Sequence, residues 1–127
     1  MKRRGAYVLL LRLAQDEQMD IGRLGTFRFR RGEYAYVGSA MGGLDTRIAR
    51  HLRTKKKRHW HIDYLLERAS VTDVLEFESS TRIECDLSDA LASCEQSTTP
   101  VRRFGSSDCH CLSHLHYLWE RDQAPDR

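Results

Sequence analysis

The stretch from Tyr34 to Arg53 constrains this chain most, because it predicts a strand, a turn and a helix in direct succession. It begins with aromatic and β-branched residues, which favour an extended strand. Segment 38–43 contains three glycines and predicts a turn. Apolar residues at helical spacing follow this turn. Arg47 and His51 stand four residues apart in the expected helix, so their side chains share one face and can approach one phosphate together.

The remaining strand signals predict an antiparallel sheet. The apolar run Gly5–Leu13, which only Arg12 interrupts, indicates a strand that is buried on both faces. Residues 15–20 are polar and favour a turn, whereas residues 21–30 favour a second strand that leads into the one at 34–37 as a meander. A further strand is expected at 71–78. The predicted fold class is α+β: a small central antiparallel three-stranded sheet, with an extra inserted strand, flanked by helices.

Helices are expected over residues 44–53, 59–67, 81–94 and 114–119. The helix at 81–94 carries an apolar stripe that includes Ile83, Leu87 and Leu91. Glu84 lies at the edge of this stripe, where a carboxylate can be partly buried and still face a cleft. The alternative is an ordinary acidic residue near a helix N-terminus, where the helix dipole favours negative charge.

Length and composition place the chain among ordinary globular domains. Its 127 residues, 40 % apolar and 31 % charged, suit one domain over 1–127 with mobile ends at 1–4 and 123–127. No apolar run approaches the ~20 residues that span a bilayer. The apolar run at 8–13 is interrupted by Arg12 and favours a buried strand over a signal peptide. A cytoplasmic protein without membrane association is expected.

Charge is distributed unevenly, although the net charge is only +3. Residues 1–60 hold 15 Lys/Arg and 5 Asp/Glu, whereas residues 61–127 hold 6 and 13. A basic surface attracts polyanions, so nucleic acid is the expected partner; the alternative is that these charges only solvate the surface. The residues expected to contact nucleic acid are Gly38, Ser39, Arg50, Arg53, Lys55, Lys56, Lys57 and Arg58.

Cysteine and histidine residues near the C-terminus raise the question of zinc. Cys109, Cys111 and His114 offer three ligands, and Cys85 or Cys94 would supply a fourth. The usual paired C-x-x-C spacing is absent, so reduced, buried cysteines are favoured over a structural zinc site. The preferred interpretation is a polar loop beside a cleft, formed by Ser106, Ser107, Asp108 and His114.

Two short motifs resemble the halves of the GIY-YIG nuclease signature, namely Gly5-Ala6-Tyr7 and Tyr36-Val37-Gly38. Three longer segments resemble one branch of that superfamily, the DUF123 family; they read GSAMGGLDTRIARHLR, HWHIDYLL and FGSSDCHCLSHL. The resemblance covers about residues 5–117 and implies a GIY-YIG-like arrangement of the predicted sheet and helices.

The resemblance also implies a metal-dependent endonuclease that hydrolyses phosphodiester bonds, with DNA as the favoured substrate. Glu84 is implied to hold one divalent cation, Mg²⁺ or Mn²⁺, and Arg47 to stabilise charge on the phosphate. Some relatives are joined to a DNA-glycosylase domain, which suggests a role in repair. The residues implied for catalysis are Tyr7, Tyr36, Arg47 and His51.

Several alternatives stay open at this point. Many GIY-YIG nucleases carry an asparagine after the metal-binding glutamate, but this chain contains no asparagine and has Gln96 at about the equivalent distance. Either the loop at 106–108 replaces it or activity is weakened or lost. The general base is a tyrosine or His51. The alternative function is a non-catalytic nucleic-acid-binding module, in which a carboxylate near Arg47 would weaken phosphate binding unless a metal bridged the two.

Overall fold

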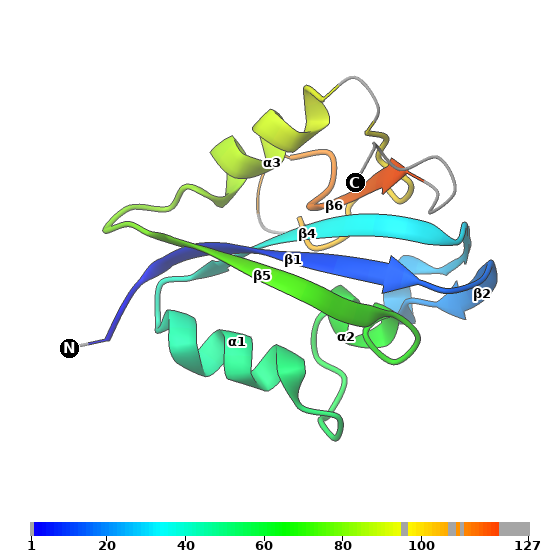
Figure 1. The fold of residues 1–127 in the computed structure, drawn as a ribbon, viewed down its shortest axis with the longest axis horizontal. Coiled ribbons are helices and arrows are strands. Elements are labelled where there is room, and N and C mark those ends of the chain that lie inside the picture. The colour runs from blue at the N-terminus through cyan, green and yellow to red at the C-terminus, as the bar shows by residue number, and fades with distance from the viewer. Residues whose placement is uncertain (1, 95–96, 107–108, 110, 120–127) are drawn as a thin grey trace.

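The computed structural model describes residues 2–94, 97–106, 109 and 111–119, and its centre is an antiparallel sheet with strand order β5-β1-β4-β6 (Figure 1). The strands of this sheet are β1 (Gly5–Leu13), β4 (Gly32–Ala40), β5 (Ser70–Glu78) and β6 (Leu115–Trp119). The helices are α1 (Leu44–Leu52), α2 (His61–Leu65) and α3 (Glu84–Ala92). The coarse prediction of a mixed fold with an antiparallel sheet and flanking helices is confirmed.

Strand β1 is an inner strand and pairs with β4 on one side and β5 on the other. Its side chains alternate between two apolar clusters, as the pleat of a strand requires. Tyr7, Leu9 and Leu11 belong to the larger cluster, Val8 belongs to the smaller one, and Leu10 packs partly buried against the smaller one. The predicted burial on both faces of this strand is therefore confirmed.

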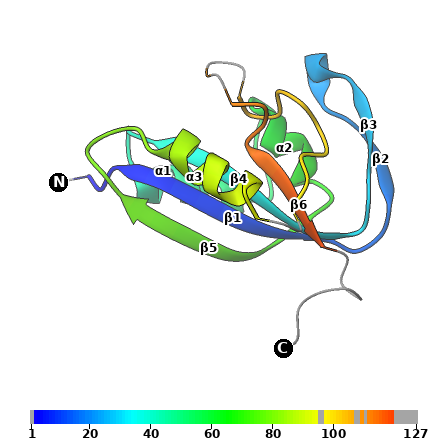
Figure 2. The ribbon, with the colours of Figure 1, turned by 90° about the horizontal axis from the view of Figure 1, so that it is seen from above.

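Helices α1 and α2 cover one face of the sheet and α3 covers the other (Figures 1 and 2). Leu44 and Ile48 of α1 are buried in the larger cluster, while Leu87 and Leu91 of α3 pack against the smaller cluster and are only partly buried. The most buried residues of α3 are instead polar, Glu84 and Ser88. The expected apolar stripe on this helix is thus weaker than the sequence suggested.

The insertion between β1 and β4 differs from the predicted meander. Strands β2 (Glu17–Asp20) and β3 (Thr26–Phe29) pair with each other, joined through a short 3₁₀ helix η1 (Gly22–Leu24), and β1 pairs directly with β4. The segment 17–20, expected to be a turn, is a strand whose Met19 is buried. Gly22 and Gly25 adopt positive φ and break the single strand expected at 21–30.

The expected helix at 114–119 is wrong, because Leu115–Trp119 forms β6 and pairs with β4. The residues that favoured a helix in fact alternate with a period of two. Leu115 and Tyr117 are buried in the larger cluster, and Leu118 packs against the smaller one. The central sheet consequently has four strands in the described part of the chain, where three were expected.

The two chain ends are described to different extents. Within the end at 1–4, Arg3 forms ion pairs with Asp45 of α1 and Glu76 of β5. Residues 123–127 and Gln96 lie outside the described part of the chain. Of the helices that are described, none combines the length and hydrophobicity needed to cross a bilayer.

Asp63 fastens the start of α2 to α1. Its side chain is 1 % exposed and accepts hydrogen bonds from Arg50 Nη1 at 3.0 Å and Nη2 at 3.1 Å. It also accepts from the backbone N–H groups of His59 and Trp60, at 2.8 and 2.9 Å. Burial alone would raise the pKa of Asp63, but these hydrogen bonds outweigh it and hold the pKa below its usual value.

Replacement Asp63→Ala is expected to lower the free energy of unfolding by about 3–5 kcal/mol, because it leaves the Arg50 charge and two backbone donors without their partner. Chemical denaturation at neutral pH measures the change. Since the folded pKa is lowered, the stabilisation is present above the unfolded pKa of about 3.9 and is lost as pH falls through the folded value. Asp73→Ala, at an exposed position, serves as the control. A loss below about 1 kcal/mol would contradict this role.

Candidate active site

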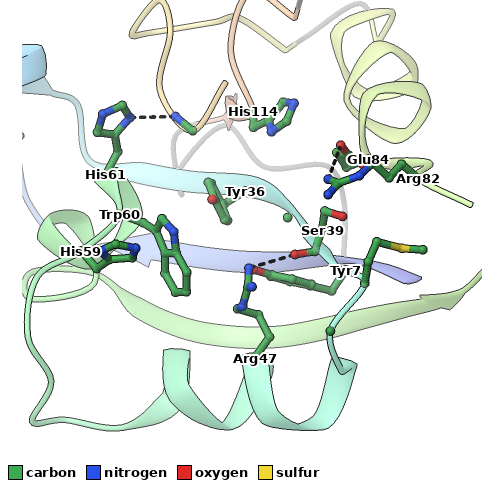
Figure 3. A pocket seen from close by; sticks show the side chains of 14 residues that line it. Tyr7, Tyr36, Ser39, Arg47, His59, Trp60, His61, Arg82, Glu84 and His114 are labelled. Carbon is green, nitrogen blue, oxygen red and sulfur yellow. Dashed lines mark hydrogen bonds and ion pairs between the residues drawn. The ribbon is translucent and has the colours of Figure 1, made fainter. Parts of the chain in front are cut away.

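A pocket of about 430 Å³ opens where the ends of β1 and β4 meet α1 and the starts of α2 and α3. The residues drawn in Figure 3 point toward this pocket from elements far apart in the sequence. Most of the side chains predicted for catalysis line it, and His51 lies behind it in contact with Tyr7. The polar lining includes Tyr7, Tyr36, Ser39, Arg47, Glu84 and His114.

Tyr7 and His51 form a buried pair at the floor of the pocket. The Tyr7 hydroxyl lies 2.6 Å from His51 Nε2, and the two side chains are almost inaccessible to solvent. Burial raises the pKa of Tyr7 to about 12, although the nearby Arg47 guanidinium lowers it. Burial also lowers the pKa of His51 to about 4. At neutral pH the phenol is therefore protonated and the imidazole is neutral.

Arg47 is held by contacts on two sides. Its Nη1 donates to the carbonyl oxygen of Ser39 at 2.9 Å, and its guanidinium lies 4.4 Å from the centre of the Trp60 ring. Arg47 belongs to α1, Ser39 to β4, and Trp60 immediately precedes α2. The guanidinium is consequently fixed in orientation before any ligand arrives, which a flexible surface arginine is not.

Glu84 brings a buried carboxylate to the same pocket. It is the first residue of α3 and is 8 % exposed, and within the described chain its Oε2 has no hydrogen-bond partner. Its Oε1 lies 3.8 Å from Arg82 Nη1. Among the described residues that line the pocket, Glu84 is the only one with a carboxylate. An oxygen left unpaired in a polar cavity fits a site for a cation, because a buried charge is otherwise costly.

Trp60 and its neighbours contribute more to the pocket than the sequence indicated. Trp60 packs partly buried against the larger cluster, as expected of a core residue, but it also lines the pocket and contacts Arg47 and Arg50, whose guanidinium lies 4.3 Å from the ring centre. His61 Nδ1 accepts a hydrogen bond from the Gly105 backbone N–H at 2.9 Å. An aromatic residue between two histidines, just after a basic run, was the signal in the sequence that could have indicated this role.

The residues expected to contact nucleic acid fall into two groups. Gly38 and Ser39 line the pocket. Three of the cations are engaged within the protein: Arg50 pairs with Asp63, Lys56 donates to the carbonyl oxygens of His51 and Arg53, and Arg58 pairs with Glu67. The other three cations of this set, Arg53, Lys55 and Lys57, are exposed. Their side chains make no hydrogen bond or ion pair in the described chain.

The polar loop expected beside the cleft is only partly described. Ser106 is buried, and its hydroxyl has no hydrogen-bond partner in the part of the chain that the structure describes. Ser107 and Asp108 lie outside the described residues. His114 does line the pocket, beside Gly105. Of the two predicted loop residues that the structure describes, His114 therefore lines the pocket and Ser106 does not.

Gly38 is required by the position of Tyr7 on the neighbouring strand. The two residues are paired in the sheet register, and a Cβ at Gly38 would collide with the Tyr7 ring. Gly38→Ala is expected to displace that ring and to destabilise the protein by about 1–3 kcal/mol. Thermal unfolding measures the loss. Gly42→Ala is the control, since a Cβ there would meet no atom within 4 Å; equal effects of the two substitutions would refute the explanation.

Comparison with known proteins identifies the family of the chain. The family model described as "Domain of unknown function DUF123" matches residues 6–127. Comparisons with curated proteins and with solved structures found no match. Because the family match covers nearly all of the chain, including every residue of the pocket, this protein belongs to the DUF123 family.

Proposed function

We propose that this protein is a GIY-YIG-type, metal-dependent endonuclease that hydrolyses phosphodiester bonds in nucleic acid, with DNA as the favoured substrate and repair as the context. The observation that carries the proposal is the convergence on one pocket of a buried carboxylate, a fixed guanidinium and a tyrosine–histidine pair. Phosphodiester hydrolysis needs an activated water, positive charge near the phosphate oxygens and a site for a Lewis acid.

The Tyr7–His51 pair supplies the proton acceptor. With a pKa of about 4, His51 is neutral at physiological pH and is able to accept the Tyr7 proton through Nε2. Tyr7 in turn takes a proton from the attacking water as its own proton passes to His51. A phenol whose pKa is about 12 is a weak acid on its own, so we assign the base function to the pair rather than to a free phenolate.

Arg47 stabilises the negative charge that develops on the phosphate. The Ser39 carbonyl and the Trp60 ring fix its orientation, so little reorganisation is needed when the charge develops. Tyr36 lines the same pocket, and its ring packs edge-on against His51 and Phe104. Its place in the wall supports the role of shaping the space for the nucleophile.

Glu84 would hold the divalent cation. Mg²⁺ commonly binds through one or two carboxylates and completes its coordination with water and phosphate oxygens, which suits a pocket lined by a single carboxylate. When bound, the cation supplies Lewis-acid polarisation of the phosphate. A non-catalytic binding module would use the exposed cations equally well, but Glu84 would repel phosphate in it.

The proposal is tested by incubating the protein with labelled duplex, branched, lesion-containing and single-stranded substrates, with Mg²⁺, with Mn²⁺ and with chelator. Arg47→Ala is expected to lower the cleavage rate about 10²-fold or more while leaving substrate affinity nearly unchanged, because Arg47 acts on charge that develops in the transition state. Arg53→Ala, in the residue that follows α1 and outside the pocket, is the matched control and should weaken affinity without lowering the maximal rate.

Metal-dependent cleavage that Arg47→Ala abolishes and Arg53→Ala retains would support the nuclease. Binding of these substrates without cleavage under any metal condition would overturn it in favour of the non-catalytic module. Equal cleavage by wild-type protein and Arg47→Ala would show that the activity does not arise in this pocket.

A further inference from the structure

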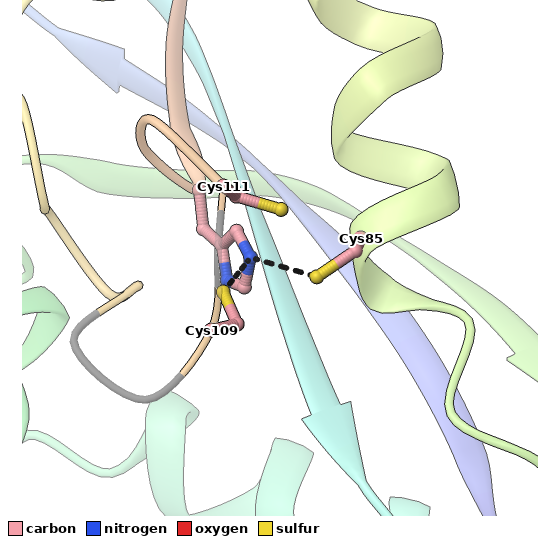
Figure 4. A group of neighbouring side chains, drawn as sticks. Cys85, Cys109 and Cys111 are labelled. Atoms are coloured by element: carbon pink, nitrogen blue, oxygen red, sulfur yellow. Dashed lines mark hydrogen bonds between the residues drawn. The ribbon is translucent and has the colours of Figure 1, made fainter.

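Four potential metal ligands converge beside the start of α3 (Figure 4). Cys85 is the second residue of α3, and Cys109, Cys111 and His114 come from the segment that precedes β6. One ligand atom from each of these residues lies within 4.8 Å of all the others. This cluster, Cys85/Cys109/Cys111/His114, shares His114 with the pocket wall but includes neither Glu84 nor the Tyr7–His51 pair.

The spacing of the four ligand atoms suits a small tetrahedral ion. Ligands about 2.3 Å from a central zinc stand roughly 3.8 Å apart. His114 Nε2 lies 3.4 Å from Cys109 Sγ and 3.9 Å from Cys85 Sγ. All four cysteines of the chain are present as thiols, so the cluster is not held by a disulfide. Three thiolates and one imidazole are a donor set typical of structural zinc.

The geometry also selects the fourth ligand, which the sequence left open between Cys85 and Cys94. Cys94 is exposed and follows the other end of α3, and its thiol contacts the Ala90 carbonyl instead. Cys85 lies in the first turn of α3, facing the loop. The absence of a C-x-x-C spacing in the sequence argued against zinc. In the structure the fourth ligand is Cys85, which lies 29 positions before His114 in the sequence.

We propose that Cys85, Cys109, Cys111 and His114 bind one structural zinc ion that fastens the loop before β6 to the start of α3. Four protein ligands leave no open coordination position, so this ion has no direct part in hydrolysis. Its effect on the pocket is positional. Glu84 is adjacent to Cys85, and His114 is itself part of the pocket wall, so the ion fixes two parts of the wall relative to each other.

Hydrogen bonds already connect the loop to its own segment and to α3. Within the described chain its backbone is tied to its own segment, through Arg103 N–H to the Leu112 carbonyl at 2.6 Å and His114 N–H to the Phe104 carbonyl at 2.8 Å. Toward α3, Ser88 Oγ donates to the Ser113 carbonyl at 2.9 Å. A metal bridge would add a strong restraint to these hydrogen bonds.

The test is elemental analysis of the full chain, purified without chelator, together with reconstitution by Co²⁺ of protein stripped of metal. We expect about one zinc per chain in wild-type protein, and with Co²⁺ the intense visible bands and thiolate charge-transfer absorption of a tetrahedral sulfur-rich site. Cys109→Ser and Cys111→Ser should each retain less than about a tenth of that zinc. Cys94→Ser, the matched control outside the cluster, should retain all of it.

Removal of zinc from wild-type protein should also lower the thermal midpoint by about 5 °C or more, with no such shift when Mg²⁺ is omitted. Wild-type protein that holds no zinc and gives no tetrahedral Co²⁺ spectrum would overturn the proposal, as would stoichiometric iron. Equal zinc loss in Cys94→Ser would overturn the assignment of ligands. None of these measurements uses cleavage, so the zinc site and the nuclease can each fail alone.

Discussion

Replacement of Glu84 by glutamine is expected to lower metal-dependent cleavage about 10²- to 10³-fold while leaving the protein folded. Glutamine keeps the size of the side chain but removes its charge, and a neutral amide binds a hard divalent cation far more weakly than a carboxylate. The loss should therefore appear in the rate at saturating substrate and should not be restored by millimolar Mg²⁺.

The same substitution should have the opposite effect on binding in chelator. Without a cation, the Glu84 carboxylate lies in the pocket proposed to receive phosphate, and its Oε2 has no hydrogen-bond partner in the described chain. Removal of this charge should leave affinity for nucleic acid unchanged or increase it, which a fluorescence titration in EDTA measures. Stability should not fall, because the amide relieves a buried charge.

The matched control is Asp86→Asn, which removes a carboxylate from the same first turn of α3 at an exposed position outside the pocket. It changes the charge near the helix N-terminus equally and should leave the cleavage rate within about twofold. Undiminished cleavage by Glu84→Gln would show that this carboxylate does not hold the catalytic cation, and the proposed mechanism would then have no cation site.

The sequence predicted those parts of the site that are built from residues close together in the chain. The strand, the glycine turn and the helix with Arg47 and His51 are each encoded over a few residues, so the approach of the helix to β4 could be foreseen. Tyr7 reaches the same pocket because β1 pairs directly with β4. The sequence did not predict that pairing, because the inserted β2–β3 hairpin was mistaken for a strand of the sheet lying between β1 and β4.

Features that depend on contacts distant in sequence were not predicted. Strand β6 was mistaken for a helix because a five-residue apolar segment is compatible with either period, and its partner β4 lies about 80 residues earlier. Trp60 packs against the core as expected, but its contacts with Arg47 and Arg50 were not predicted because those residues lie on α1. The cysteine cluster could not be recognised from spacing alone, since Cys85 and His114 are brought together only by the packing of α3 on the sheet.

Tyr7→Phe is expected to lower the cleavage rate about 10²-fold or more at saturating substrate, with little change in affinity. The substitution removes only the hydroxyl, which lies 2.6 Å from His51 Nε2 and is proposed to pass the proton of the attacking water to it, and retains the ring at the floor of the pocket. Tyr34→Phe is the matched control, because that buried hydroxyl also loses one hydrogen bond, to the Arg30 carbonyl at 2.5 Å, outside the pocket.

The pH dependence tests the role of His51 separately. An unperturbed histidine would produce an acid limb near pH 6.5, whereas burial lowers the pKa of His51 to about 4 and keeps it able to accept a proton well below neutrality. Single-turnover cleavage should therefore stay nearly constant from about pH 7.5 to about pH 5. An acid limb near pH 6.5 that disappears in a His51→Gln variant would show that the imidazole is not held neutral as proposed.

The lowered pKa of His51 also predicts how the free energy of unfolding depends on pH. Measuring that dependence distinguishes a loss of cleavage caused by protonation of His51 from one caused by unfolding. The folded state favours the neutral imidazole, so the stabilisation is complete above the unfolded pKa of about 6.5 and is lost as pH falls toward about 4. A shift of this size corresponds to about 3 kcal/mol. Denaturation at pH 7.5 and at pH 5 should show that the His51→Gln variant loses less stability on acidification than wild-type protein does. Equal losses in the two proteins would mean that another group titrates.

Constant cleavage across a range in which stability already declines would mean that the folded molecules keep a neutral His51, as the proposed transfer of the Tyr7 proton requires.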